Sequence, residues 1–145
     1  MPWDKVILDT NVFIDYLRVG LHEEWIAGRV PGTVRFLSSI VLLELRLGAD
    51  TPRRRRAVDG IKAAFPPSRW LAPGPELYDQ AGTLFRSAFG DGKALLTQGD
   101  RLGAMNDLLI ALSARHIGAR VVTNNVRDFE RIARCMPGFQ WSPPA

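Results

Sequence analysis

The fold is decided by residues 5–14, Lys5-Val6-Ile7-Leu8-Asp9-Thr10-Asn11-Val12-Phe13-Ile14. Residues 5–8 form a short, mostly apolar run, which is typical of a strand buried in a parallel sheet. Residues 11–18 have the spacing of a helix. The stretch therefore predicts a strand, a polar turn and a helix in direct succession, which is the first unit of an α/β fold.

The same alternation continues along the chain. We predict further strands and helices over the following ranges, together with a loop over 90–99: strands 34–37, 70–71, 120–123 and 139–141; helices 23–27, 38–48, 52–65, 76–89, 105–117 and 126–133. Because no tight hairpin turns join the strands, we expect a central parallel β-sheet flanked by α-helices. Ligands of such sheets bind beyond the carboxyl ends of the strands.

Composition limits the classes of protein that the chain can represent. Its 145 residues predict a single domain, 1–145, and 46% hydrophobic with 23% charged residues excludes a disordered protein. One cysteine and two histidines exclude an internal disulfide and argue against a zinc site. The net charge of +4 favours a polyanionic partner. No apolar run approaches the ~20 residues of a membrane span, and the first residues lack a signal-peptide pattern, so we expect a cytoplasmic protein without membrane association.

Asp9 directly follows the first predicted strand. An aspartate at that position points into the crevice at the carboxyl edge of the sheet. The alternative is that Asp9 or Asn11 only caps the following helix.

Glu44 is expected on a helix, on the same face as Ile40 and Leu47. A carboxylate on an apolar stripe should be paired, protonated or associated with a metal, since burying an unpaired charge is costly. The alternative is a salt bridge to Arg46 or Arg53.

Two further acidic residues belong to the last third of the chain. Asp107 is predicted to open an almost entirely apolar helix, so its first turn would lie deep in the fold. The alternative is that Asn106 or Asp107 is only the N-cap of that helix. Asp128 follows the strand at 120–123 within a few residues, although an acid there would also suit the start of a helix.

If these acidic residues converge, their mutual repulsion would raise some of their pKa values. A divalent cation relieves that repulsion, and ligation by oxygen alone suits Mg²⁺ or Mn²⁺. Such ions activate water and neutralise charge in phosphodiester hydrolysis. A basic protein with an acidic crevice of this kind is consistent with a nuclease.

Four segments resemble the motifs of PIN-domain proteins, particularly the VapC toxins of bacterial toxin–antitoxin pairs. They occur in the order of that family and span residues 6 to 129: Val6–Ile14, Ser38–Leu45, Asn106–Ala114 and Val121–Phe129. Any one segment is a weak signal, whereas four in order are a strong one. The resemblance implies a PIN-like α/β fold and a metal-dependent ribonuclease specific for single-stranded RNA.

The resemblance also implies roles for individual residues. It makes Asp9, Glu44 and Asp107 the acidic site that holds Mg²⁺ or Mn²⁺ and positions the attacking water. Supporting polar groups around these carboxylates would come from the following residues: Thr10, Asn11, Thr123 and Asn125.

The fourth acidic position departs from the usual pattern of the family. Many PIN domains carry an aspartate where this chain has Asn125, and the chain offers Asp128 three residues later. Either Asp128 completes the catalytic site or a second metal is held weakly.

Partners implied by the resemblance are an RNA substrate and a cognate antitoxin, within a homodimer or a toxin–antitoxin hetero-oligomer. The antitoxin would lie across hydrophobic helices, where Leu17, Trp25 and Leu45 are candidate contacts. The alternative for each of these three residues is an ordinary place in the core.

Other functions compete with the toxin. A small-substrate phosphohydrolase would use Asp9 as a nucleophile, but the chain lacks an Asp-x-Asp at that strand end and a Gly-rich phosphate loop. A non-catalytic PIN-like binding module is a second alternative, which Asn125 favours and the intact Asp9, Glu44 and Asp107 oppose. A housekeeping RNA-processing nuclease is a third.

Overall fold

Parallel strands form a five-stranded sheet in the computed structural model, which describes residues 3–90 and 97–145. In chain order they are β1 (Asp4–Leu8), β2 (Thr33–Ser38), β3 (Trp70–Leu71), β4 (Arg120–Val122) and β5 (Gln140–Ser142). Their order across the sheet is β3-β2-β1-β4-β5, and β1 at the centre pairs Ile7 with both Phe36 and Val121. The predicted parallel sheet is confirmed.

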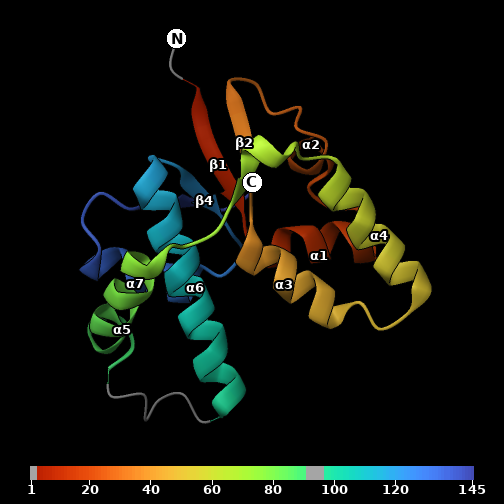
Figure 1. Ribbon diagram of the computed structural model, residues 1–145. Helices are drawn as coiled ribbons and strands as arrows, with labels where there is room; N and C mark the ends of the chain where they lie inside the picture. The colour runs from red at the N-terminus through yellow and green to blue at the C-terminus, as the bar shows by residue number, and fades with distance from the viewer. Residues whose placement is uncertain (1–2, 91–96) are drawn as a thin grey trace.

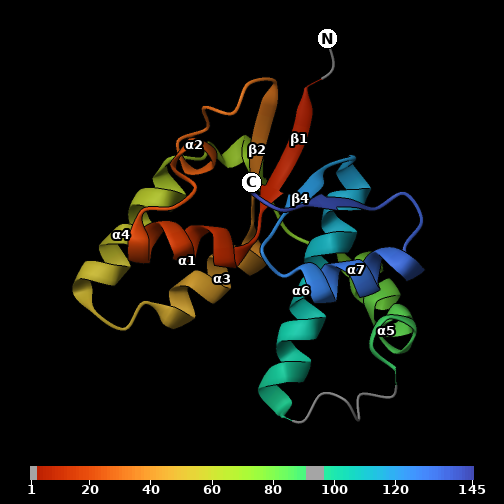
Figure 2. The same ribbon diagram turned by 180° about the vertical axis from the view of Figure 1, so that it is seen from behind.

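Helices cover both faces of this sheet (Figure 1). Their bounds are α1 (Thr10–Val19), α2 (Glu23–Ile26), α3 (Ser39–Gly48), α4 (Pro52–Ala63), η1 (Pro67–Arg69), α5 (Pro75–Phe89), α6 (Gln98–Ile117) and α7 (Val126–Cys135). The two opposite views show α1 to α4 on one side of the sheet and α5 to α7 on the other (Figures 1 and 2). Val6, Ile7 and Leu8 of β1 are almost completely buried, since helices cover both faces of the sheet. A continuous apolar run such as this one is typical of a strand in that position.

Polar side chains fix where several helices begin. Asp9 caps α1 by accepting a hydrogen bond from the amide of Thr10, and Ser38 caps α3 by accepting one from the amide of Ile40. The cap of α4 is Thr51, followed by a proline in the first turn. These caps place the start of α1 and of α3 at the ends of β1 and β2.

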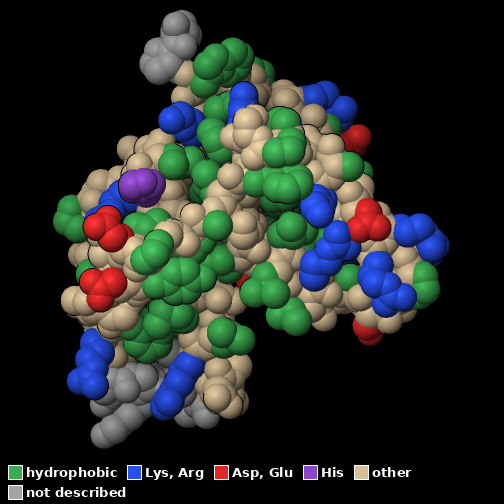
Figure 3. All heavy atoms as spheres, viewed as in Figure 1, with side chains coloured by type: hydrophobic (Ala, Val, Ile, Leu, Met, Phe, Trp, Pro, Cys, Tyr) green, Lys and Arg blue, Asp and Glu red, His purple; other side chains and the backbone are tan. Residues whose placement is uncertain are grey.

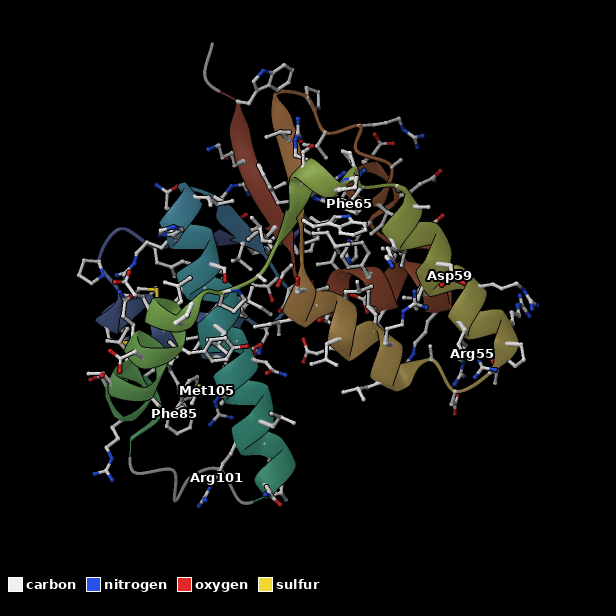
Figure 4. The ribbon with its side chains drawn as sticks, in the orientation of Figure 1. Arg55, Asp59, Phe65, Phe85, Arg101 and Met105 are labelled. Carbon is white, nitrogen blue, oxygen red and sulfur yellow. The ribbon has the colours of Figure 1, made fainter. Side chains whose placement is uncertain are left out.

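The predicted start of the long apolar helix is wrong. Helix α6 begins at Gln98, and Thr97 and Asp100 form a reciprocal capping box at its N-terminus. Asp107 therefore lies in the middle of α6, so neither a helix-opening nor an N-cap role applies to it. Of the predicted loop over 90–99, residues 91–96 lie outside the described residues, and Gln98 and Gly99 are helical. Figure 4 shows Met105 of α6 beside Phe85 of α5, and both side chains pack against the core.

The topology creates a crevice beside β1. The chain proceeds outward from β1 to β2 and β3, then returns across the sheet to β4 on the other side of β1. The connections leave the carboxyl ends of β1 and β4 toward opposite faces, which is where doubly wound sheets bind their ligands. Within residues 3–90 and 97–145, no helix is both long enough and apolar enough to cross a bilayer.

Candidate active site

A pocket of about 480 Å³ opens at the carboxyl ends of β1 and β4. Five acidic side chains line it: Asp100 near the start of α6, and four from separate segments of the chain that form the candidate acidic cluster, namely Asp9, Glu44, Asp107 and Asp128. Thr10, Asn11 and Asn125 also line it. Figure 3 shows the surface hollowed between the side that carries α3 and α4 and the side that carries α5 and α6. The structure thus brings together acidic residues that are up to 119 positions apart (128 − 9).

Asp9 is the most firmly held of the four carboxylates. One oxygen accepts the backbone N–H of Thr10 at 2.9 Å. The other oxygen accepts the hydroxyl of Thr123 at 2.7 Å and the side-chain amide of Asn11 at 3.2 Å. Asp9 is both the helix cap that the sequence allowed and a lining residue of the pocket.

Thr123 lies behind the pocket and is completely buried. Besides donating to Asp9, its hydroxyl accepts the backbone N–H of Asn125 at 2.9 Å and the side-chain amide of Asn11 at 3.3 Å. Asn11 in turn accepts the backbone N–H of Asn124 at 3.0 Å. These bonds join the end of β1 to the end of β4 and fix the position of Asp9.

Glu44 is oriented by Thr10, whose hydroxyl donates to its carboxylate at 2.6 Å. The alternative salt bridge is wrong, because Arg46 pairs with Asp59 at 2.7 Å and no ion pair to Glu44 occurs among the described residues. The apolar stripe was also predicted incorrectly, since Leu47 is 71% exposed. Glu44 is half-buried at the edge of the core, where its carboxylate reaches the pocket.

Asn125 connects the remaining two carboxylates. Its side-chain amide donates to Asp107 at 3.1 Å and to Asp128 at 3.3 Å. Asp107 is buried, whereas Asp128 is half-buried in the first turn of α7. The residue that departs from the usual acidic pattern therefore holds two acidic neighbours in place.

The environment favours protonation of two of these carboxyl groups. Burial raises the pKa of Asp9 to about 6, opposed by its hydrogen bonds from Thr123 and Thr10 and reinforced by repulsion from Glu44. Burial also raises the pKa of Asp107 to about 9, and repulsion from Asp9, Glu44 and Asp128 adds to the effect. In the absence of a cation, the close approach and burial of these groups therefore favour their neutral, protonated form.

The donor set fits a hard divalent cation. The carboxylates offer oxygen ligands alone, which Mg²⁺ and Mn²⁺ prefer, and a cation would relieve the repulsion that raises the pKa of Asp107. Across residues 3–90 and 97–145, no three acidic, histidine or cysteine side chains lie close enough to form a complete ligand set. This is compatible with Mg²⁺, which usually keeps several water ligands and uses only one or two carboxylates.

Sequence reasoning missed several residues of the pocket. Arg127 and Arg131 line it from α7, and Gly99 and Gly103 line it from α6. The spacing of the two arginines by four residues, on either side of Asp128, was an available signal. The glycines gave none, because their helix was predicted to begin after them.

Comparison with known proteins identifies the fold family. The family model of the PIN domain matches the sequence of this chain over residues 6–134. The chain belongs to the PIN domain family. No curated protein matches this PIN domain in sequence.

Several solved structures of VapBC systems are similar to this PIN domain. DNA-bound VapBC from Salmonella typhimurium matches with 26% identity and a TM-score of 0.67, over 98% of this chain and 99% of that chain. VapBC-1 from nontypeable Haemophilus influenzae matches with 26% identity and a TM-score of 0.61, over 97% and 98% of the two chains. VapBC2 from Rickettsia felis, bound to a promoter DNA fragment, shares the fold at 23% identity with a TM-score of 0.66, over 96% and 98%.

Proposed function

We propose that this PIN domain is a metal-dependent endoribonuclease that acts as the toxin of a toxin–antitoxin pair. The observation that carries the proposal is the convergence of Asp9, Glu44, Asp107 and Asp128 on one open pocket. Similarity to VapBC structures over nearly the whole length of both chains supports the toxin assignment. The similarity and the intact acidic set make a non-catalytic binding module the weaker candidate.

Three of the four acidic residues share one task in this proposal, and neighbouring polar groups orient them. Asp9, Glu44 and Asp107 would surround Mg²⁺ or Mn²⁺, with one or two of these carboxylates as direct ligands and water completing the set. The cation would lower the pKa of a water molecule and offset charge on the phosphodiester. Thr123 and Asn11 keep Asp9 in one orientation, and Thr10 does the same for Glu44. Asp128 would take the fourth acidic place, which the hydrogen bonds of Asn125 to both Asp107 and Asp128 support.

The reaction supported by this arrangement is hydrolysis of the RNA backbone by water. The four carboxylates line one pocket, where together with the cation they would position the water for attack on the phosphodiester. Their fixed hydrogen bonds reduce the reorganisation needed as charge develops, which is the main source of electrostatic catalysis.

Cleavage of a mixed panel of single-stranded RNAs tests the proposal. We expect the purified protein, freed of any co-purifying partner, to cut RNA with Mg²⁺ or Mn²⁺ and not with EDTA. Asp9→Asn should lower the rate by at least about 100-fold, because it removes a carboxylate at the reacting centre. Retention of RNA binding without cutting under every condition would instead support a non-catalytic module.

An apolar groove offers the antitoxin a place to bind. The groove has a volume of about 320 Å³ and lies between α1 and α4, with Leu17 and Ile61 among its lining residues. Leu17 is 41% exposed and is available for such a contact. Leu45 is buried in the core, so the alternative structural role applies to it. Trp25 is half-buried and donates a hydrogen bond to the carbonyl of Pro144.

A further inference from the structure

The acidic pocket has one basic wall. Arg127 and Arg131 of α7 are the basic side chains that line it, beside Asp128. Their spacing of four residues places them on the same side of the helix, while Phe129 and Ile132 are buried against the core. Two guanidinium groups therefore flank one side of the acidic cluster.

Neither arginine is neutralised by the acidic residues around it. Throughout the described part of the chain, Arg29, Arg46, Arg54 and Arg120 form ion pairs, whereas Arg127 and Arg131 form none. Asp100 and Asp128, which line the same pocket, accept hydrogen bonds from other residues.

The hydrogen-bond partners of these acidic side chains come from within the protein. Asp128 accepts a hydrogen bond from Asn125, and Asp100 of α6 is used in the capping box with Thr97. Glu130 of α7 is exposed. The guanidinium groups of the basic wall thus retain donors that can bind an incoming anion.

An RNA strand bound at this pocket needs basic side chains, because its phosphates are negatively charged. A cation in the acidic cluster offsets charge at the scissile phosphate, but the phosphates next to it still face a cluster of carboxylates. Arginine binds phosphate in a bidentate manner with strong charge-assisted hydrogen bonds. Among the described residues, no lysine or arginine lines the opposite wall, which α1 and α3 form.

We propose that Arg127 and Arg131 bind RNA phosphates adjacent to the scissile phosphate, so that the RNA backbone runs along α7. This inference rests on the proposed nuclease function and adds the residues that position its substrate. The two arginines act before the chemical step, by holding the strand in register with the carboxylates.

Fluorescence anisotropy with a fluorescein-labelled, single-stranded RNA dodecamer of mixed sequence tests this inference. The assay contains EDTA, so that the RNA stays intact, and salt is varied from about 50 to 200 mM, a range over which phosphate contacts weaken strongly. We expect Arg127→Gln and Arg131→Gln each to weaken binding about tenfold, since each loses a charged hydrogen bond to phosphate. Each should also reduce the slope of log affinity against log salt by about 0.7.

Arg134→Gln is the matched control, because Arg134 is exposed on the same helix but does not line the pocket. Its affinity and salt slope should remain within twofold of the unmodified protein. With Mg²⁺ present, the two pocket variants should raise the KM for RNA cleavage by more than they lower kcat. Thermal melting of all three variants should coincide, which separates a binding defect from unfolding.

The outcomes distinguish this inference from the nuclease assignment. If the unmodified protein cuts RNA and the pocket variants bind like Arg134→Gln, the basic wall has no role and the nuclease assignment stands. If the unmodified protein neither binds nor cuts RNA, both are overturned.

Discussion

Asp107 shows how a single residue can be costly to the fold and useful to the site. Its carboxyl group is buried among three other carboxylates, which raises its pKa to about 9. In the unfolded chain the same group titrates near 3.8. The folded protein therefore binds a proton that the unfolded chain releases, and stability falls as pH rises between these two values.

Asp107→Asn should remove this pH dependence. The amide keeps an oxygen to accept the hydrogen bond from Asn125 and carries no charge. We expect the metal-free variant to melt at least about 5 °C above the unmodified protein at pH 8, with the difference vanishing near pH 4. Melting curves in EDTA across this pH range measure it, and Mg²⁺ should narrow the gap by stabilising the unmodified protein alone.

The melting temperature of Asp9→Asn provides a comparison with that of Asp107→Asn. An asparagine in its place has one acceptor oxygen, whereas Asp9 uses two oxygens to accept from Thr10, Thr123 and Asn11. Relief of repulsion is then offset by lost hydrogen bonds, so its gain should be smaller than that of Asp107→Asn. Equal melting temperatures for unmodified protein and Asp107→Asn at every pH would show that the buried carboxyl group carries no such cost.

Individual residues of the site differ in how well the sequence predicts them. Asp9 and Asp128 follow strands, so the rule that sheet edges bind ligands was sufficient to select them. The contact of Thr10 with Glu44 joins positions 34 residues apart, and local patterns do not encode which rotamers meet across such a distance. The pairing of Arg46 with Asp59 was missed for the same reason.

Among the helices, α6 contributes two glycines, Gly99 and Gly103, to the lining of the pocket. Gly103 lines the pocket one turn before Asp107, and a Cβ built on it meets nothing within 4 Å. A glycine inside a helix costs about 1 kcal/mol relative to a good helix former. Space for the substrate beside Asp107 is a physical reason for a glycine at this position.

Gly103→Leu should therefore separate stability from activity. We expect it to stabilise the protein by up to about 1 kcal/mol, measured by denaturant unfolding, while its side chain fills the pocket and lowers RNA cleavage by at least about tenfold. Gly82→Leu is the matched control, since Gly82 is an exposed residue within α5 whose Cβ would also meet nothing. It should stabilise the protein similarly and leave cleavage unchanged. Full cleavage by Gly103→Leu would mean that the RNA does not approach this part of α6.

The same glycines explain the main error in predicting the elements. Gly99 and Gly103 lower the helical propensity of the first turns of α6, and the apolar pattern becomes regular only after Met105. The capping box of Thr97 and Asp100 overrides that propensity. Elsewhere caps and apolar periodicity agree, as at Ser38 for α3, and the predicted element matches the observed one.

At the scale of the whole molecule, the pocket and the apolar groove involve different parts of the same helix. Asn11 near the start of α1 lines the acidic pocket, and Leu17 near its end lines the groove between α1 and α4. A partner segment bound in the groove would lie close to the substrate site without occupying the metal ligands. This arrangement fits a toxin that an antitoxin controls by covering its surface.

Growth of a bacterial host that expresses this PIN domain tests whether an antitoxin controls its toxicity. Expression of this PIN domain alone should arrest growth, and co-expression of its cognate antitoxin should restore it. Leu17→Glu places a charge in the apolar groove, so it should keep the toxicity and weaken the rescue, because burying an unpaired carboxylate against the partner is costly. Val19→Glu is the control, since Val19 is 69% exposed and lies outside the groove. Unimpeded growth with soluble, RNA-cleaving protein would reject the toxin role and favour a housekeeping RNA-processing nuclease.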